Sequence, residues 1–256
     1  MKTNKYKVNK SSRKKSLQDG NPSYGDSIVE IGLLFINAPY KAGTLEITKK
    51  EKLIVNVSAF DCTTFVEAVI ALARCASAGK ILRNEFRRNL QLIRYRRGKI
   101  NGYSSRLHYF TDWLRDNEKK KILINVSRRL GGKPQCKKIN FMTYNRKLYV
   151  ALNNKTQFAK MLAAEKNLSR KTFYIIEKDK LNTQKAIIQN GDIIAFTTNQ
   201  EGLDVAHSGF AIWYRKNLHL LHASKKEGAV VISQKTLTAF LKSNKKFTGI
   251  IVARPL

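Results

Sequence analysis

Acidic residues are scarce in this sequence. Its 256 residues include 18 Asp and Glu against 49 Lys and Arg, which gives a formal net charge of +31. Dense Lys and Arg bind phosphate backbones by releasing counterions, and they attract other polyanions in the same way. The basic residues are spread along the chain, so we do not expect nucleic-acid binding to be the main function. An anionic cell-wall polymer fits the charge equally well.

Long apolar runs and paired cysteines are also missing. The longest plain apolar run covers residues 31–36, far short of the roughly 18 residues that a membrane span needs, so we expect no transmembrane segment. Three cysteines are too few for disulfide bonds to stabilise a chain of this length. They lack Cys-x-x-Cys spacing and no His-Glu-x-x-His occurs, so we expect no metal site. No phosphate-binding glycine motif occurs either, and no cofactor is expected.

The apolar fraction of 43% is enough for a sizeable core. No Pro-, Gly- or Ser-rich linker divides residues 21–256, which we therefore expect to form one domain and a monomer. Residues 1–20 carry seven basic side chains and almost nothing apolar, the composition of a disordered basic tail. This tail lacks the apolar middle of a secretory signal, so residues alone leave both a cytoplasmic and an exported protein open.

Apolar spacing predicts helices first and strands later. Helical spacing occurs over residues 27–35, 61–77, 86–93, 106–113 and 158–168. Asp61 suits the N-cap of the second helix, and Thr64 with Glu67 offers a capping box one turn later. Strand patterns occur over residues 193–196, 205–214, 218–223, 229–233 and 249–253, and we expect them to form an antiparallel meander. This order indicates an α+β fold.

Cys62 is the cysteine best placed for chemistry. It follows Asp61 at the start of a strong helix, where unpaired N–H groups and the helix dipole favour a thiolate. A thiolate attacks a carbonyl carbon. The alternative is a small buried side chain on the apolar face. Cys75 lies late in the same helix and we interpret it as structural.

His207 and His222 lie on consecutive predicted strands and could supply a base and the group that orients it. They lie directly opposite each other if the turn is centred on Tyr214 and Arg215. A turn at Lys216 and Asn217 shifts them by four residues, roughly 13 Å at 3.3 Å per residue. A dyad therefore predicts the first register, or a looser loop with a bulge. Two core histidines bonded to backbone are the alternative.

Five ordered motifs carry a resemblance to NlpC-type cell-wall cysteine hydrolases, and it covers residues 28–254. They are Pro39-Tyr40-Lys41-Ala42-Gly43, Phe60-Asp61-Cys62-Thr63-Thr64-Phe65, Gly191-Asp192-Ile193-Ile194-Ala195-Phe196, Ala206-His207-Ser208-Gly209-Phe210 and Leu221-His222-Ala223-Ser224. The sequence is most similar to the N-acetylmuramoyl-L-alanine amidase-like branch, in residues 93–96, 103–113 and 202–204. Thr63 and Thr64 replace the usual Ser-Gly, which separates this chain from the peptidases of the superfamily.

The resemblance implies a papain-like fold with N-terminal helices packed on a C-terminal antiparallel sheet. It implies that Cys62 is the nucleophile, His207 the general base and His222 the residue that orients it. Tyr40 then borders the cleft and Asp61 lies beside the nucleophile. Further substrate contacts are expected from the following residues: Arg106, His108, Trp113 and Asp204.

The function that the resemblance implies is metal-free hydrolysis of the amide between N-acetylmuramic acid and L-Ala in peptidoglycan fragments, in the periplasm or outside the cell. Two other functions stay open. One is a γ-D-glutamyl endopeptidase that cuts the stem peptide. The other is a basic nucleic-acid- or wall-binding protein whose cysteine site is inactive.

Overall fold

The computed structural model of the chain describes residues 23–46, 50–79 and 82–256. The predicted basic tail lies outside these residues, and its separation from one catalytic domain stays a prediction. The α-helices are α2 (Tyr24–Leu33), α3 (Cys62–Ser77), α4 (Arg83–Arg94), α5 (Phe110–Lys119), α6 (Phe141–Tyr144), α7 (Lys155–Ser169), α8 (Leu181–Gln184) and α9 (Leu237–Ser243). Short 3-10 turns are η1 (Arg96–Gly98), η2 (Tyr103–Ser105), η3 (Arg146–Leu148), η4 (Val150–Asn153) and η5 (Lys185–Ile187). No helix in these residues is long and apolar enough to cross a membrane.

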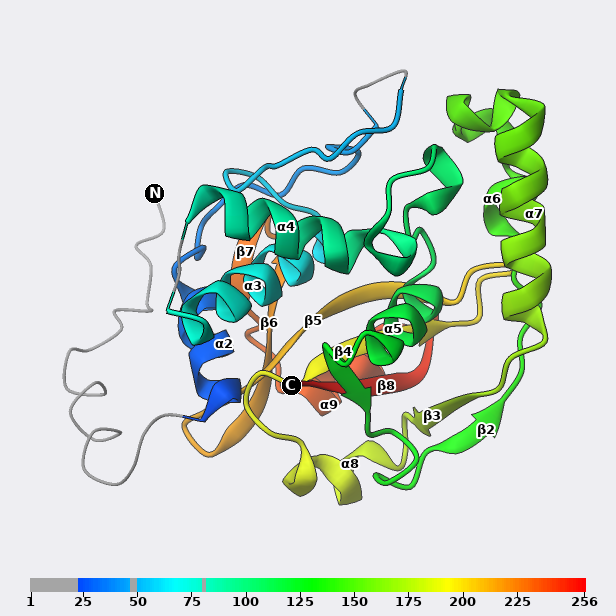
Figure 1. Cartoon of the computed structure of the whole chain (residues 1–256). Coiled ribbons are helices and arrows are strands. Elements are labelled where there is room, and N and C mark those ends of the chain that lie inside the picture. Colours follow the sequence, from blue (N-terminus) through cyan, green and yellow to red (C-terminus); the bar gives the residue numbers. More distant parts are fainter. Residues whose placement is uncertain (1–22, 47–49, 80–81) are drawn as a thin grey trace.

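One antiparallel sheet forms the centre of the protein (Figure 1). Its strands are β1 (Leu123–Asn125), β2 (Lys133–Gln135), β3 (Phe173–Glu177), β4 (Ile193–Thr198), β5 (Val205–Tyr214), β6 (Asn217–Ser224), β7 (Ala229–Ile232) and β8 (Phe247–Pro255). The order is β2-β3-β8-β4-β5-β6-β7, with β1 also paired to β8. The structure thus has the mixed helix and antiparallel-sheet composition that the sequence predicts.

The predicted meander is correct for β4 to β7 and wrong for the last strand. Instead of following β7, β8 pairs with β4 on the other side of the meander. Its residues Ile250, Ile251, Val252 and Ala253 are all buried, so side chains on both faces of this strand are covered. A strand of this kind belongs in the interior of a sheet and not at its edge.

The middle of the chain departs most from the prediction. The sequence pattern did not predict strands β1, β2 and β3. They are only three to five residues long, and β2 is largely exposed. The helix expected over residues 106–113 begins instead at Phe110. Arg106 is extended and forms an isolated antiparallel bridge with Tyr95.

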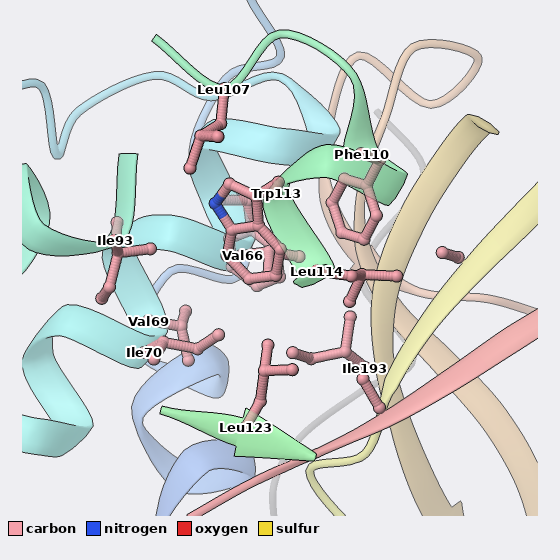
Figure 2. Close-up of a cluster of buried hydrophobic side chains, with 14 of the residues drawn as sticks. Val66, Val69, Ile70, Ile93, Leu107, Phe110, Trp113, Leu114, Leu123 and Ile193 are labelled. Carbon is pink, nitrogen blue, oxygen red and sulfur yellow. The ribbon is translucent and has the colours of Figure 1, made fainter. Parts of the chain in front are cut away.

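Separate apolar clusters cover the two faces of the sheet. Helices α2 to α5 contribute to the first, in which the ring of Phe65 on α3 packs edge-on against Phe210 of β5, with 5.8 Å between centroids. Figure 2 shows part of this cluster, with Trp113 set among aliphatic side chains. Helix α9 covers the second cluster on the opposite face, through Leu237 and Leu241. The sheet is therefore the rigid element that positions side chains from several helices.

Candidate active site

Cys62 is the first residue of α3, as the sequence predicts, and it is half-buried. Asp61 caps the helix, because its Oδ1 accepts the Thr64 N–H at 2.8 Å. The Thr64 hydroxyl in turn accepts the Asp61 N–H at 2.9 Å. The capping box is therefore formed by these two residues and not by Thr64 with Glu67. Glu67 is buried and pairs with Arg94 at 2.7 Å.

His207 and His222 form the predicted pair. Nε2 of His207 lies 2.7 Å from Nδ1 of His222, and the rings meet at 84° with their centroids 4.8 Å apart. The pair packs against Phe240 of α9 and, through His207, against Phe196 of β4. Within the described residues, neither imidazole has a hydrogen bond to a backbone group, which was the alternative considered from the sequence; the two rings bond to each other instead.

The register that joins the histidines is neither of the two considered from the sequence. Tyr214 pairs with Asn217, so Arg215 and Lys216 form the turn, both with positive φ. This register places His222 opposite Gly209, two residues from His207 along β5. A Cβ atom at Gly209 would lie 2.8 Å from the His222 Cβ. The imidazoles therefore meet diagonally, within the reach of large side chains, and across a glycine.

Ser208 connects the cysteine to the histidine pair. Its hydroxyl donates to the Cys62 carbonyl at 3.2 Å, and hydrogen bonds from its backbone and side chain favour the thiolate of Cys62. Because Ser208 follows His207 directly, the start of α3 is anchored next to the dyad. Among the described residues, no hydrogen bond joins the Cys62 sulfur to either ring. Ser208 is not among the site residues predicted from the sequence, although it lies inside the motif around His207.

The electrostatics of the site correct the expectation of a resting thiolate. Burial raises the pKa of the Cys62 thiol, and the neighbouring Asp61 carboxylate raises it further. Burial lowers the pKa of His207 to about 4. Burial and then the proximity of His207 lower the pKa of His222 to about 3. At neutral pH the site therefore holds a thiol and two uncharged imidazoles, because burial disfavours the charged form of each group.

Tyr40 lies at the cysteine, as predicted. Its backbone forms a parallel bridge with Phe60, and the Lys41 N–H donates to the Phe60 carbonyl at 2.8 Å. Burial raises the pKa of the Tyr40 phenol, and Cys62 and then Asp61 raise it further. The phenol therefore stays protonated and can donate a hydrogen bond near the sulfur.

Arg106 and His108 both pack against the ring of Tyr103. Nη2 of Arg106 donates to Oε1 of Glu46 at 2.7 Å, and its guanidinium lies 4.9 Å from the centroid of the Tyr103 ring. His108 stacks on the same ring and its Nε2 is 2.9 Å from the Tyr103 carbonyl. Burial, and then Arg106, lower the pKa of His108, so it is uncharged.

Trp113 is not available to a sugar, contrary to the prediction. Its side chain is fully buried and stacks on Phe110 with centroids 5.0 Å apart. Figure 2 shows the indole enclosed by Val66 of α3 and Leu114. Trp113 is buried and does not contact sugar because it lies on the inner face of α5. An aromatic residue at helical spacing is more often part of the core than of a binding site.

Asp204 is buried and tied to the fold. Its Oδ2 accepts both the Thr111 N–H and the Thr111 hydroxyl at 2.7 Å, and its Oδ1 accepts the Val205 N–H. This joins the first turn of α5 to the start of β5. Asp204 also lines a cavity of about 240 Å³ with Thr197 and Thr248. Its contact with substrate stays a prediction.

The site combines a cysteine at a helix start with a histidine pair on a sheet, the elements of a nucleophilic hydrolase. Comparison with known families then identifies its class. Residues 30–250 match the model of a family described as AmiA-like, N-acetylmuramoyl-L-alanine amidase-like. The chain belongs to this family, which is one of hydrolases that act on peptidoglycan. No curated protein matches the sequence.

Solved structures with a similar fold include one that carries the amidase name. An N-acetylmuramoyl-L-alanine amidase from Bacteroides uniformis is 39% identical, with a TM-score of 0.86 over 91% of this chain and 99% of that one. A Bacteroides fragilis protein described as a candidate xylanase is 46% identical, with a TM-score of 0.84 over 88% and 99%. A Legionella pneumophila protein shares the fold at 23% identity, with a TM-score of 0.69 over 92% and 90%.

Proposed function

We propose that this protein is a cysteine amidase that hydrolyses the amide between N-acetylmuramic acid and L-Ala in peptidoglycan fragments. The observation that carries the proposal is the placement of Cys62 at the start of α3, anchored through Ser208 next to the His207–His222 pair. Membership of the amidase-like family supports the choice of bond. The order of a cysteine helix followed by a histidine sheet supports a papain-like, NlpC-type fold. The periplasm or cell exterior is where such fragments would be met.

The hydrogen bond between the rings defines the roles of the two histidines. His207 can accept a proton at Nδ1 only if its Nε2 carries the other proton and donates it to Nδ1 of His222. His222 is then protonated at Nε2 and holds the first ring in this tautomer. His207 is thereby prepared to act as the general base and, once protonated, as the general acid.

The reaction follows from a neutral thiol and a neutral imidazole. His207 takes the Cys62 proton as the sulfur attacks the carbonyl carbon of the lactyl amide, and the resulting oxyanion is held by the N–H of Cys62 at the helix start. The Tyr40 hydroxyl is a second donor. The C–N bond breaks as His207 returns the proton to the amine of L-Ala. Water, deprotonated by His207, then cleaves the C–S bond of the thioester and releases the muramic acid carboxylate.

The gap between sulfur and imidazole in the free protein is compatible with this sequence of steps. Catalytic hydrogen bonds in unliganded sites are often long, and they tighten when substrate is bound. The Ser208 hydrogen bonds keep the start of α3 fixed to β5. Proton transfer then requires the Cys62 and His207 side chains to approach each other when substrate binds.

Mass analysis of products from a defined N-acetylmuramoyl tripeptide tests the proposal. An amidase releases the whole peptide with a free L-Ala amine and leaves the muramic acid carboxylate. A γ-D-glutamyl endopeptidase instead leaves L-Ala–D-Glu on the sugar, and this product would contradict the proposed bond. A protein that only binds the wall would give neither product. Xylan is the control substrate, because a glycosidase ordinarily needs two carboxyl groups at the scissile bond.

A further inference from the structure

A buried arginine with unused hydrogen-bonding capacity lies beside the turn that follows the Tyr40 segment. The side chain of Arg106 is 6% exposed, whereas that of its partner Glu46 is 47% exposed. One Arg106 nitrogen, Nη2, reaches one oxygen of that carboxylate at 2.7 Å. Nε of Arg106 is buried without a hydrogen-bond partner, and lies 3.4 Å from Glu51. The pairing with Glu46 therefore leaves the bidentate geometry of the guanidinium unused.

The phenol of Tyr103 is a second unused group at the same place. Its hydroxyl is buried without a hydrogen-bond partner, and Arg106 lies over its ring. Burial and then the Glu46 carboxylate raise the pKa of Tyr103, which places the hydroxyl near that carboxylate. Buried polar atoms without partners cost stability, so two of them around one surface carboxylate require an explanation.

The position of this cluster fits a ligand that also reaches the nucleophile. The segment that leads to Glu46 starts at Tyr40, beside Phe60 and the start of α3. Five residues lie between Tyr40 and Glu46, so the two are at most about 20 Å apart along an extended chain. A peptide of three to five extended residues spans roughly 10 to 18 Å. The charges of Asp61 and Arg106 both act on buried Glu67, so the cluster lies close enough to the start of α3 for a stem peptide held at Cys62 to reach it.

We propose that Arg106 and Tyr103 bind a carboxylate of the stem peptide, and that Glu46 occupies this place in the free protein. This inference rests on the proposed function, because it takes the peptide as substrate. A ligand carboxylate has two oxygens, one for each unused donor, so it satisfies Nε of Arg106 and the Tyr103 hydroxyl together. Glu46, on an exposed turn, moves outward into water at little cost.

The test is the affinity of the full chain, in a Cys62→Ala background, for the tripeptide L-Ala–γ-D-Glu–L-Lys measured by calorimetry. We expect Glu46→Gln to tighten binding about fivefold to tenfold, because a competing carboxylate is removed. Glu85→Gln is the matched control, since it removes the same charge from an exposed pair with Arg88. The same peptide with its carboxylates converted to amides should gain nothing from Glu46→Gln.

A second variant separates binding from stability. Tyr103→Phe removes a buried hydroxyl without a partner, so it should leave the melting temperature unchanged or higher while it weakens peptide binding severalfold. A merely structural cluster predicts that Glu46→Gln leaves affinity unchanged and lowers stability, and that result would overturn the inference. Equal gains for acid and amide peptides would overturn it as well. Product analysis with active protein judges the proposed function separately, because this binding needs no hydrolysis.

Discussion

Nδ1 of His222 on β6 lies 2.7 Å from Nε2 of His207 on β5, in a diagonal contact between the two strands. This contact is possible because Gly209 has no side chain to fill the space beside His222. The residue directly opposite His222 is this glycine, and it has an ordinary strand conformation. Its function is therefore steric: the absence of a side chain lets the second imidazole approach the first.

Gly209→Ala should separate the two rings. The new Cβ would lie 2.7 Å from the Leu221 carbonyl and 2.8 Å from the His222 Cβ, so the strands or the imidazole must shift. We expect a loss of activity of about a hundredfold or more, from misplacement of the base, and a destabilisation of about 1–3 kcal/mol. Steady-state kinetics and thermal unfolding measure these effects. Gly79→Ala is the control: it meets no atom within 4 Å, and its positive φ affects stability alone. Full activity in Gly209→Ala would contradict the role assigned to the pair.

Cys62→Ala should abolish amide hydrolysis while the fold is retained, because no other described group at the site is a comparable nucleophile. Product release from a defined muropeptide measures the loss, and circular dichroism checks the fold. Cys136→Ala is the matched control, since Cys136 is also a free cysteine but is exposed and directly follows β2, which lies four positions from β5 in the sheet order. If hydrolysis persists in Cys62→Ala, the nucleophile has been assigned wrongly.

The resting thiol makes a prediction about pH. Because burial and Asp61 raise the pKa of Cys62, the rate of its alkylation by iodoacetamide should still be rising above pH 8 rather than levelling off near neutrality. Asp61→Asn keeps an N-cap oxygen and removes the charge, so it should move the alkylation profile to lower pH. A profile already flat at pH 6 would indicate a thiolate–imidazolium pair instead.

Stability should depend on the histidine pair at acid pH. The unfolded chain binds protons at imidazoles near pH 6.5, whereas burial holds the native pKa of His207 at about 4 and that of His222 at about 3. Between these values the unfolded state binds more protons, so the free energy of unfolding falls as pH drops from 6.5 toward 4 and below. His222→Gln should make this decline shallower. Urea unfolding at several pH values tests it; an identical slope in the variant would contradict the pKa assignment.

Local patterns predicted the elements that carry the site. The capped helix at Cys62 and the strands with His207 and His222 were found because periodicity and capping are properties of neighbouring residues, whereas Tyr40 was found through the family resemblance. Patterns of this kind say nothing of what faces a residue across the fold. Trp113 has the same spacing in a core helix as in a binding helix, and only its burial shows which it is.

The sequence by itself determined the family, the α+β composition and the residues that could react, because these depend on residue type and short-range order. Tertiary structure decided the turn at Arg215 and Lys216, the insertion of β8 beside β4, and the ionisation of the site. Each of these depends on burial or on partners distant in the chain. Burial and the Asp61 carboxylate both raise the pKa of the Cys62 thiol, and the position of Cys62 at a helix start does not reveal either effect.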